Sequence, residues 1–524
     1  MRGSQILTAC VVLLALIVGS SVRAEDSPLA RVGRVAIAEG SVAVRAAGAE
    51  WADSGPNDPV AAGMSVRTAA QGRAVLHIGA ETIALFAATE IDLAQLDASG
   101  TQIVLRRGQI GVHLSQLDPA RSIEIDIARG GVWLLTPGEY EITAGDERAP
   151  SRIAVMDGRA RFVGKGLDAA VATGSATELS GSDPVSATLH GPAADDSVAW
   201  WRPTTGRDAD PQALRHVSAE MTGHEALDGH GIWQTIDGYG AVWFPQTLPD
   251  GWAPFRHGRW RWVAPWGWNW IDDMAWGFAP SHYGRWARLA GPDKDTERWG
   301  WVPGKLVANP AYMPASVAFL GTAGVGLSCP NGIGPAVAWF PLAPGEAYWP
   351  SFTHDLDAIR RLNADSVADL STIGPAVNDG PPADIVNGDY RNRRFASVVP
   401  RAVFLGGRPV APALVDLPEG RLENAPVLAG SPQLAPRATL MAAAAAAMDR
   451  RIAPKLATAV QALSRILKPR GTTNSVRAAV LVRSASTPAR LSRALVRSPA
   501  RSRVVGKATA RTASLNVAAP RRHP

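Results

Sequence analysis

The sequence predicts a mostly β protein: an N-terminal β domain, a tryptophan-rich domain of β-hairpin repeats, and a basic tail that is partly helical and otherwise disordered. Three observations lead to this prediction. Short runs of alternating apolar and polar residues fill residues 31–163. A tryptophan-rich passage repeats itself, since residues 251–260 (GWAPFRHGRW) return as residues 277–286 (GFAPSHYGRW). Residues 437–524 carry 18 Lys and Arg against one acidic residue, whereas the rest of the chain is acidic overall.

The first 24 residues have the features of a secretory signal peptide. Arg2 precedes an apolar stretch over residues 6–18, and residues 22–24 (VRA) offer a small-residue cleavage site. A retained membrane anchor is the alternative, but this stretch is shorter than the ~20 residues that span a bilayer. We therefore expect cleavage and export, which leaves Cys329 as a single buried thiol that forms no internal disulfide.

Residues 31–163 form the first predicted domain. In the run from Ser122 to Ile127, the three isoleucines share one face of a strand while Glu124 and Asp126 share the other. Four further runs have strand character: residues 34–37, 41–45, 74–78 and 101–105. Many short strands separated by turn residues indicate a sandwich or a roll.

The same domain resembles the FecR-type periplasmic domain. The resemblance covers roughly residues 35–163, and its motifs are listed here: GMSVRT at 63–68, GRAVLHI at 72–78, TEIDL at 89–93, RGQIG at 107–111, TPG at 136–138 and VMDG at 155–158. FecR regulators couple a periplasmic sensing domain to a cytoplasmic anti-sigma segment. This chain departs from that plan, because a signal peptide occupies its N-terminus. The resemblance implies a periplasmic binding or interaction module.

Residues 164–215 are polar, rich in Gly, Ser and Ala, and are predicted to be a linker. The tryptophan-rich domain follows at residues 216–345, and residues 233–301 hold 12 of the chain's 18 tryptophans. Between Trp260 and Trp270 the rings alternate in two sets around a bend at residues 265–267. We expect short antiparallel hairpins whose aromatic faces pack together.

These rings allow two interpretations, a packed core or an exposed aromatic surface for sugars or peptides. Each Trp offers roughly 150–250 Å², and soluble monomers rarely expose apolar patches beyond a few hundred Å². Most of the rings should therefore be buried. Under the second interpretation, the ligand-binding side chains are Trp260, Trp266, Trp268, Trp270, Arg285 and Trp286.

The block from Glu220 to Gly304 also resembles a proteobacterial tryptophan-rich domain of unknown function that often follows a FecR-like domain. The motifs that carry this resemblance are YGAVW at 239–243, GWAP at 251–254, PWGW at 265–268, WGFAP at 276–280, HYGRW at 282–286 and WGWVPG at 299–304. The likeness continues to about residue 410. It implies an architecture and a location but no catalytic residues.

A search for reactive groups finds little. Asp272 and Asp273 are adjacent, so on a strand they would point to opposite faces, which does not suit a shared acid–base site. His224 and His230 lack the spacing of a helical zinc pair. Nucleophile elbows, phosphate loops and dinucleotide fingerprints do not occur in the sequence. We expect no catalytic residues, no metal and no cofactor.

The last two segments are less regular. Residues 346–436 are rich in Pro, Gly and Asn and are predicted to cover the tryptophan-rich domain as loops. Within residues 437–524 an Ala-rich helix over 439–467 is expected, followed by a disordered basic extension. Because the chain is exported, the tail's expected partner is an anionic envelope surface and not nucleic acid. A tail that is only solvated is the alternative.

Together these features predict a non-enzymatic periplasmic or secreted protein of a Gram-negative envelope that binds an envelope protein or glycan. A sensing or scaffold role fits this class. The alternative is a protein that binds or hydrolyses envelope polysaccharide, with exposed Trp residues as sugar subsites and either Asp272 or Asp273 as the acid–base residue.

Overall fold

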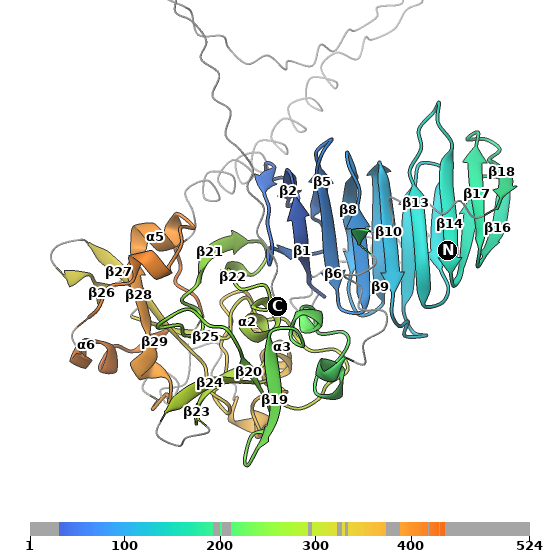
Figure 1. Ribbon diagram of the computed structural model, residues 1–524. Helices are drawn as coiled ribbons and strands as arrows, with labels where there is room; N and C mark the ends of the chain where they lie inside the picture. Colours follow the sequence, from blue (N-terminus) through green and yellow to red (C-terminus); the bar gives the residue numbers. More distant parts are fainter. Residues whose placement is uncertain are drawn as a thin grey trace, which may run out of the picture. The chain divides into compact units, whose positions relative to one another are not determined.

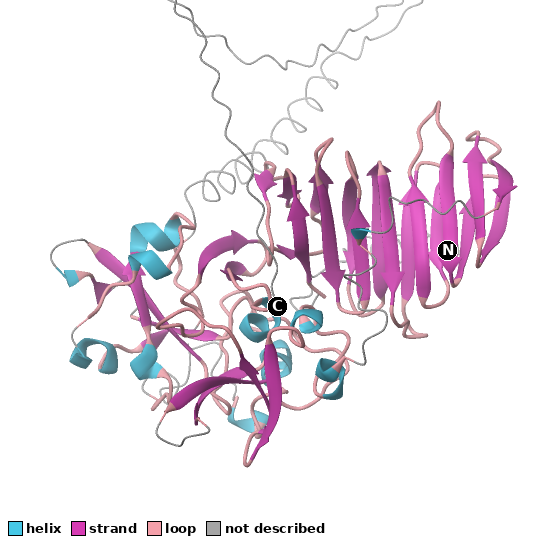
Figure 2. Ribbon diagram, viewed as in Figure 1, coloured by secondary structure: helices cyan, strands magenta, loops and turns pink. Residues whose placement is uncertain are grey.

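Two nine-stranded sheets form the N-terminal β domain (Figures 1 and 2). In this computed structural model the described residues are 31–191, 200–201, 211–291, 296–321, 327–330, 334–373, 388–417, 419–428 and 430–434. The first sheet, sheet A, has the order β18-β17-β14-β13-β10-β7-β6-β1-β4, and the second, sheet B, has the order β16-β15-β12-β11-β9-β8-β5-β2-β3. The chain adds strands to the two sheets alternately, singly or as pairs that are mostly hairpins. The sandwich therefore grows in sequence order along both sheets.

The strands of sheet A are β1 (Gly33–Glu39), β4 (Pro59–Val60), β6 (Arg73–Ile78), β7 (Glu81–Leu85), β10 (Gln109–Leu114), β13 (Gly138–Thr143), β14 (Ser151–Asp157), β17 (Ser175–Ser180) and β18 (Ser186–His190). Those of sheet B are β2 (Val42–Arg45), β3 (Ala52–Asp53), β5 (Ser65–Thr68), β8 (Glu90–Leu96), β9 (Gly100–Arg107), β11 (Ser122–Ile127), β12 (Gly130–Leu134), β15 (Arg159–Gly164) and β16 (Leu167–Ala172).

An aliphatic core lies between the two sheets. Ile123, Ile125 and Ile127 of β11 are buried in it, as their period of two predicts, while Glu124 and Asp126 are half-buried on the opposite face. β11 pairs with β9 in parallel and with β12 antiparallel. All five runs that the sequence marks as strands are strands in the structure. The mostly β fold class is thereby confirmed.

Residues 164–215 differ from the predicted linker. Strands β16, β17 and β18 occupy residues 167–190 and extend both sheets of the sandwich. Their side chains are mostly small or polar and bury little surface; all five residues of β18 are exposed. Strands at the end of a sandwich have less core to fill, so the alternation of apolar and polar residues over 167–190 is weak. Farther on, Trp201 is fully buried against Gly111, where a Cβ atom would lie 2.5 Å from the indole.

The tryptophan-rich domain is built from smaller sheets. A four-stranded sheet has the order β19 (Gly231–Ile236), β20 (Gly240–Pro245), β24 (Glu297–Val302) and β23 (Arg285–Ala290). A separate hairpin joins β21 (Gly258–Val263) to β22 (Gly267–Asp272). A third sheet contains β25 (Val317–Leu320), β26 (Leu327–Ser328), β27 (Pro335–Pro341), β28 (Ser397–Pro400) and β29 (Val427–Leu428). The short α2 (Phe278–His282) precedes β23.

The two copies of the repeated passage each lead into a hairpin. The first copy ends in β21 and the second ends in β23, so that Trp260 pairs with Trp270 and Trp286 pairs with Trp301 across the two hairpins. The bend expected at residues 265–267 lies between β21 and β22. The hairpin prediction is therefore confirmed, but the two copies belong to different sheets.

The tryptophan rings pack as a core. Ten of the twelve rings between residues 233 and 301 are buried, while Trp233 and Trp262 are half-buried against the same cluster. Trp260 lies at the centre, with ring centroids 5.1–5.4 Å from those of Trp270, Phe319, Trp339 and Phe404. Edge-to-face arrangements at such distances stabilise aromatic cores beyond the area that they bury.

Residues 346–436 contain more structure than the predicted loops. They supply α3 (Leu356–Asn363), α5 (Arg401–Leu405), α6 (Glu419–Glu423), and strands β28 and β29 of the third sheet. The segment also contains the 3-10 helices η6 (Leu370–Thr372), η8 (Arg393–Phe395) and η9 (Ala411–Ala413), whereas η3 (Gln212–Arg215) and η4 (His224–Ala226) lie before β19. Asp355 caps α3 by accepting from the backbone N–H of Ala358. Backbone pairing, which hydropathy does not encode, joins this segment to the domain.

The predicted signal peptide and the basic tail lie outside the described residues, as does the predicted helix over 439–467. All of the described residues belong to one compact unit. Within the described part of the chain, none of the helices combines the length and the apolar character needed to cross a membrane. Cys329 is buried and free, as expected.

Candidate functional site

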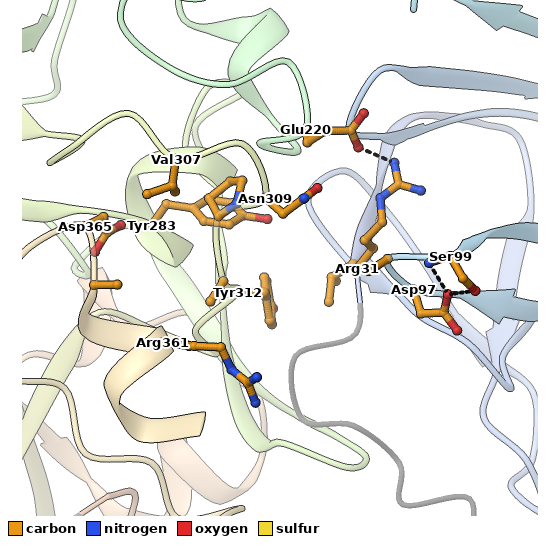
Figure 3. A pocket seen from close by; sticks show the side chains of 15 residues that line it. Arg31, Asp97, Ser99, Glu220, Tyr283, Val307, Asn309, Tyr312, Arg361 and Asp365 are labelled. Carbon is orange, nitrogen blue, oxygen red and sulfur yellow. Dashed lines mark hydrogen bonds and ion pairs between the residues drawn. The ribbon is translucent and has the colours of Figure 1, made fainter. Parts of the chain in front are cut away.

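A cavity lies where the β domain meets the tryptophan-rich domain. Its volume is about 560 Å³, within the ~300–1,000 Å³ typical of ligand pockets. The β domain contributes the residues around Arg31 and the β8–β9 turn at residues 97–99. The other domain contributes Tyr283, residues 307–312 and the C-terminal end of α3 (Figure 3). We call this space the junction cavity.

A closed ring of four charged side chains borders the cavity. Arg31 contacts Glu81 at 2.9 Å and Glu220 at 2.7 Å, and Arg121 contacts the same two carboxylates at 2.6 and 2.9 Å. Each charge therefore has two partners of opposite sign. Burial alone would lower the pKa of Arg31, but Glu81 and Glu220 raise it above its ordinary value. We call these four residues the junction ring.

The junction ring needs a close approach between the domains. Gly79 lies beside it with φ +57°, and a Cβ atom there would lie 2.7 Å from Glu220 and 2.9 Å from Arg31. Its backbone N–H donates to the hydroxyl of Thr222, which in turn donates to the carbonyl of Val32. Glycine is therefore required both for the backbone conformation and for the space.

Two further contacts fix the junction. Glu225 of the tryptophan-rich domain contacts Arg34 at 2.6 Å and His77 at 2.5 Å. Burial alone would raise the pKa of Glu225, but Arg34 and His77 hold it well below its usual value. Asn57 donates its side-chain amide to the backbone carbonyls of Asp272 and Met274. The two domains are thus joined by specific polar contacts that span about 200 residues of sequence.

The cavity wall combines aromatic rings with charged groups. Tyr283 and Tyr312 are buried, and burial raises the pKa of both phenols, so the rings are neutral. Partial burial alone would raise the pKa of Asp97, but hydrogen bonds from Ser99 and Gln95 lower it, and this carboxylate is ionised. Such a wall can hold a molecule with an apolar body and polar ends.

A cation and a second carboxylate complete the wall. Arg361, in the last turn of α3, is exposed and makes no ion pair with a described residue. Burial raises the pKa of Asp365, although Arg285 partly opposes this effect. A guanidinium without an acidic partner can donate to an anionic group of a ligand.

The six side chains predicted to bind a ligand lie elsewhere. Their exposed fractions are at most 3%: Trp260 1%, Trp266 2%, Trp268 3%, Trp270 0%, Arg285 0% and Trp286 2%. The ring of Trp286 donates from Nε1 to the carbonyl of Pro280, and Arg285 donates to the side-chain oxygen of Asn363. These groups form the core of the domain. The hypothesis that they present an aromatic surface to ligands is corrected accordingly, because the rings pack on one another instead of facing solvent.

The two aspartates weighed as an acid–base residue have different surroundings. Asp272 is buried at the end of β22, where it accepts from the indole of Trp270 and the backbone N–H of Met274. Burial raises its pKa to about 7, and those hydrogen bonds oppose the rise. The side chain of Asp273 is half-exposed and lies 3.9 Å from Arg259. Neither residue lines the junction cavity.

The two histidines weighed as a zinc pair each contact the backbone. His224 and His230 each contact a nearby backbone carbonyl, those of Met221 and Ala226. Within the described ranges, there is no group of three or more His, Cys, Asp or Glu side chains with the geometry to hold a metal ion.

Sequence reasoning missed the junction cavity. Arg31 and Glu220 are 189 residues apart, and single charged residues between strands give no pattern that marks them as partners. The stretch at residues 307–312 (VANPAY) carries no recognised motif. Only the tertiary arrangement of the two domains brings these residues together.

Comparisons with known proteins add a family for part of the chain. Residues 224–346 match a family described as a family of unknown function (DUF6600). Two crystal structures of a candidate anti-sigma factor from Parabacteroides distasonis are similar at 11% and 10% identity, with a TM-score of 0.23 in both cases. That similarity covers 26% of this chain and 63%, less than two thirds, of the solved chain. A TM-score this low supports no inference. No curated protein matches. The comparisons thus show a similarity, over residues 224–346, to a family whose function is unknown.

Proposed function

We propose that this chain is an exported, non-enzymatic binding protein of a Gram-negative envelope, and that its ligand occupies the junction cavity. The observation that carries the proposal is a cavity of about 560 Å³ whose wall comes from both domains. A ligand in this position would contact the β domain and the tryptophan-rich domain at once. Its chemistry would be amphipathic, because neutral Tyr283 and Tyr312 line the cavity together with Asp97 and Arg361.

Binding is favoured over catalysis by the state of the polar groups. The carboxylate of Asp97 accepts from the side chain and backbone of its own turn, and Glu220 is held by two arginines. The hydroxyl of Tyr312 donates to Asn269 at 2.8 Å. Groups engaged in this way position a ligand well but are poorly placed to exchange protons with it.

Export is supported by the sequence of residues 1–24, which has the charged, apolar and small-residue segments of a signal peptide. The resemblance of residues 35–163 to a periplasmic FecR-type domain supports the same compartment. A role in sensing follows if ligand binding changes how the two domains are held together at the junction ring.

Native mass spectrometry of the full chain, purified from a bacterial periplasmic fraction, tests the proposal. We expect a small-molecule adduct on the wild-type chain and its loss in Ala311→Trp, which fills the junction cavity. Ala172→Trp, at the exposed end of β16, is the matched control and should keep the adduct. An adduct retained equally in both variants, or a chain found only in the cytoplasm with residues 1–24 intact, would contradict the proposal.

A further inference from the structure

The outer face of sheet B carries a second hollow, which shares no lining residue with the junction cavity. Its volume is about 280 Å³, and its wall includes Trp51, Asp53, Arg67 and Arg107, with Ala43 among the lining residues. Ala43, Arg67, Glu90 and Arg107 occupy one row across neighbouring strands, and Asp53 pairs with Ala43 at its end. The short side chain of Ala43 leaves the space that its larger neighbours surround.

Trp51 is the aromatic wall of this hollow. The guanidinium carbons of Arg45 and Arg67 lie 4.5 and 4.2 Å from the centroid of its ring. The ring is half-buried, in contrast to the ten fully packed rings of the tryptophan-rich core. Stacking on an indole leaves the in-plane N–H donors of a guanidinium free to bind a carboxylate.

Charge pairing on this face is incomplete. Arg107 forms an ion pair with Glu90 at 3.0 Å, and Arg106 forms one with Asp92 at 2.7 Å. Arg67 lies directly opposite Glu90 in the strand register, yet it makes no ion pair with any described residue. The exposed carboxylate of Asp53 likewise has no hydrogen-bond donor among the described residues. The hollow therefore presents a donor group and an acceptor group that both lack partners.

We propose that this hollow binds an acidic sugar residue of an envelope polysaccharide, a uronic acid in particular. The sugar carboxylate accepts from Arg67, and its hydroxyls donate to Asp53. Trp51 lines the hollow and holds the guanidinium of Arg67 in place by stacking. A simple anion such as phosphate would satisfy Arg67 but would bring a second negative charge next to Asp53. The combination of donor, acceptor and aromatic wall therefore fits a hydroxylated acid better than a bare anion. This site is independent of the junction cavity.

Arg67→Ala and Arg73→Ala provide a matched comparison. Arg73 also stacks on an indole, that of Trp200 at 4.5 Å, but Glu39 neutralises it. Each variant removes one positive charge, so any general attraction between the basic tail and a polyanion is equal in both. Hydrogen bonds to charged groups contribute about 1.5–3 kcal/mol, so Arg67→Ala should bind polygalacturonate roughly tenfold or more weakly, and Arg73→Ala should bind it as the wild type does.

The measurement is titration calorimetry of the full chain with polygalacturonate, with neutral dextran and inorganic phosphate as comparisons. We expect binding of polygalacturonate alone, weakened by Arg67→Ala and by Asp53→Ala. Asp53 distinguishes the ligand class, because its removal should strengthen the binding of a simple anion but weaken that of a sugar that donates to it. Equal affinity in the Arg67 and Arg73 variants, stronger binding by Asp53→Ala, or displacement by phosphate at equal concentration would overturn the proposal. Circular dichroism confirms that each variant is folded.

Discussion

The two domains of this chain solve the problem of burial in different ways. The β domain packs aliphatic side chains between two regular sheets, and successive strands pair along the sequence. The tryptophan-rich domain has shorter sheets and long loops, and its interior is filled by indole rings. In the first domain, backbone ladders fix the chain. In the second, large side chains must also do so.

Indole N–H groups show how loops are held. The ring of Trp339 donates to the carbonyl of Phe255, and that of Trp268 donates to the carbonyl of Leu434, 166 residues away in sequence. The ring of Trp301 donates to the carbonyl of Tyr283 at 2.8 Å. A tryptophan thus supplies both buried area and a donor for backbone groups that lack a strand partner. Buried indole rings can therefore take over part of the backbone hydrogen bonding that strand pairing provides in a regular sheet.

The largest expected effect concerns the centre of the aromatic core. Trp260→Ala removes a ring that contacts four other aromatic side chains and should lower the free energy of unfolding by about 3–5 kcal/mol. Ile103→Val, in the aliphatic core, should cost about 0.5–1.5 kcal/mol. Urea denaturation followed by circular dichroism measures both. A cost below that of Ile103→Val would show that Trp260 is not part of a packed core.

The junction ring should be nearly as sensitive. Glu81→Ala leaves Arg31 and Arg121 without one of their two carboxylate partners, and removing one member of a buried ion pair costs about 3–5 kcal/mol. Asp168→Ala breaks an exposed pair with Arg161 and should change little. Differential scanning calorimetry should show two separated transitions for the Glu81 variant, because the ion pairs that hold the two domains together are weakened. A single, unshifted transition would contradict this view of the junction.

Two buried groups in the tryptophan-rich domain should oppose each other in pH dependence. Burial raises the pKa of Asp272 from 3.8 to about 7, so its contribution to stability is lost as pH rises through this range. Burial lowers the pKa of His282 from 6.5 to about 4, so its contribution is lost as pH falls through that range. Each group changes the free energy of unfolding by on the order of 1.4 kcal/mol per pH unit. The two slopes have opposite signs and nearly cancel where the ranges overlap, between about pH 4 and 6.5.

Single substitutions should separate these slopes. Asp272→Asn leaves the effect of His282, so stability should rise between about pH 4 and 6.5. His282→Asn leaves the effect of Asp272, so stability should fall over the same interval. Urea denaturation at several pH values, with the wild type as reference, measures both. Parallel profiles for the two variants would rule out this opposition.

The smallest expected difference isolates one hydrogen bond. Trp301→Phe removes the pyrrole portion of the indole together with its hydrogen bond to the carbonyl of Tyr283. The Nε1 of Trp260 has no hydrogen-bond partner among the described residues. Trp260→Phe therefore removes a ring part alone. Trp301→Phe should cost about 1 kcal/mol more, because it leaves a buried carbonyl unsatisfied. Equal costs in chemical denaturation would show that the indole bonds contribute nothing beyond packing.

Much of the β domain could be predicted from the sequence, because half-buried strands have a period of two. Ile123, Ile125 and Ile127 illustrate this, since one face of their strand meets the core. The strands over residues 167–190 could not be predicted in the same way. Ala169 and Ala172 are small, and the edge strand β18 is fully exposed, so burial leaves little pattern there.

The packing of the tryptophans could be predicted from area alone, but the candidate sites could not. The junction cavity depends on the pairing of Arg31 with Glu220, which only the tertiary fold determines. The hollow beside Trp51 depends on strand register, which places Arg67 next to Ala43 and Glu90. The sequence pattern favours residues 233–301 as a ligand surface, but most of the rings there are buried. Trp51, which lines a hollow, belongs to no such pattern.

Hydroxyl-radical footprinting with mass spectrometry, which measures the oxidation of individual tryptophans, tests whether the repeated passage is an interior. We expect Trp260, Trp266 and Trp270 to be oxidised far more slowly than Trp51, and polygalacturonate to protect Trp51 but none of these three rings. Oxidation of the three core rings at the rate of Trp51, with protection when a glycan is added, would contradict this expectation.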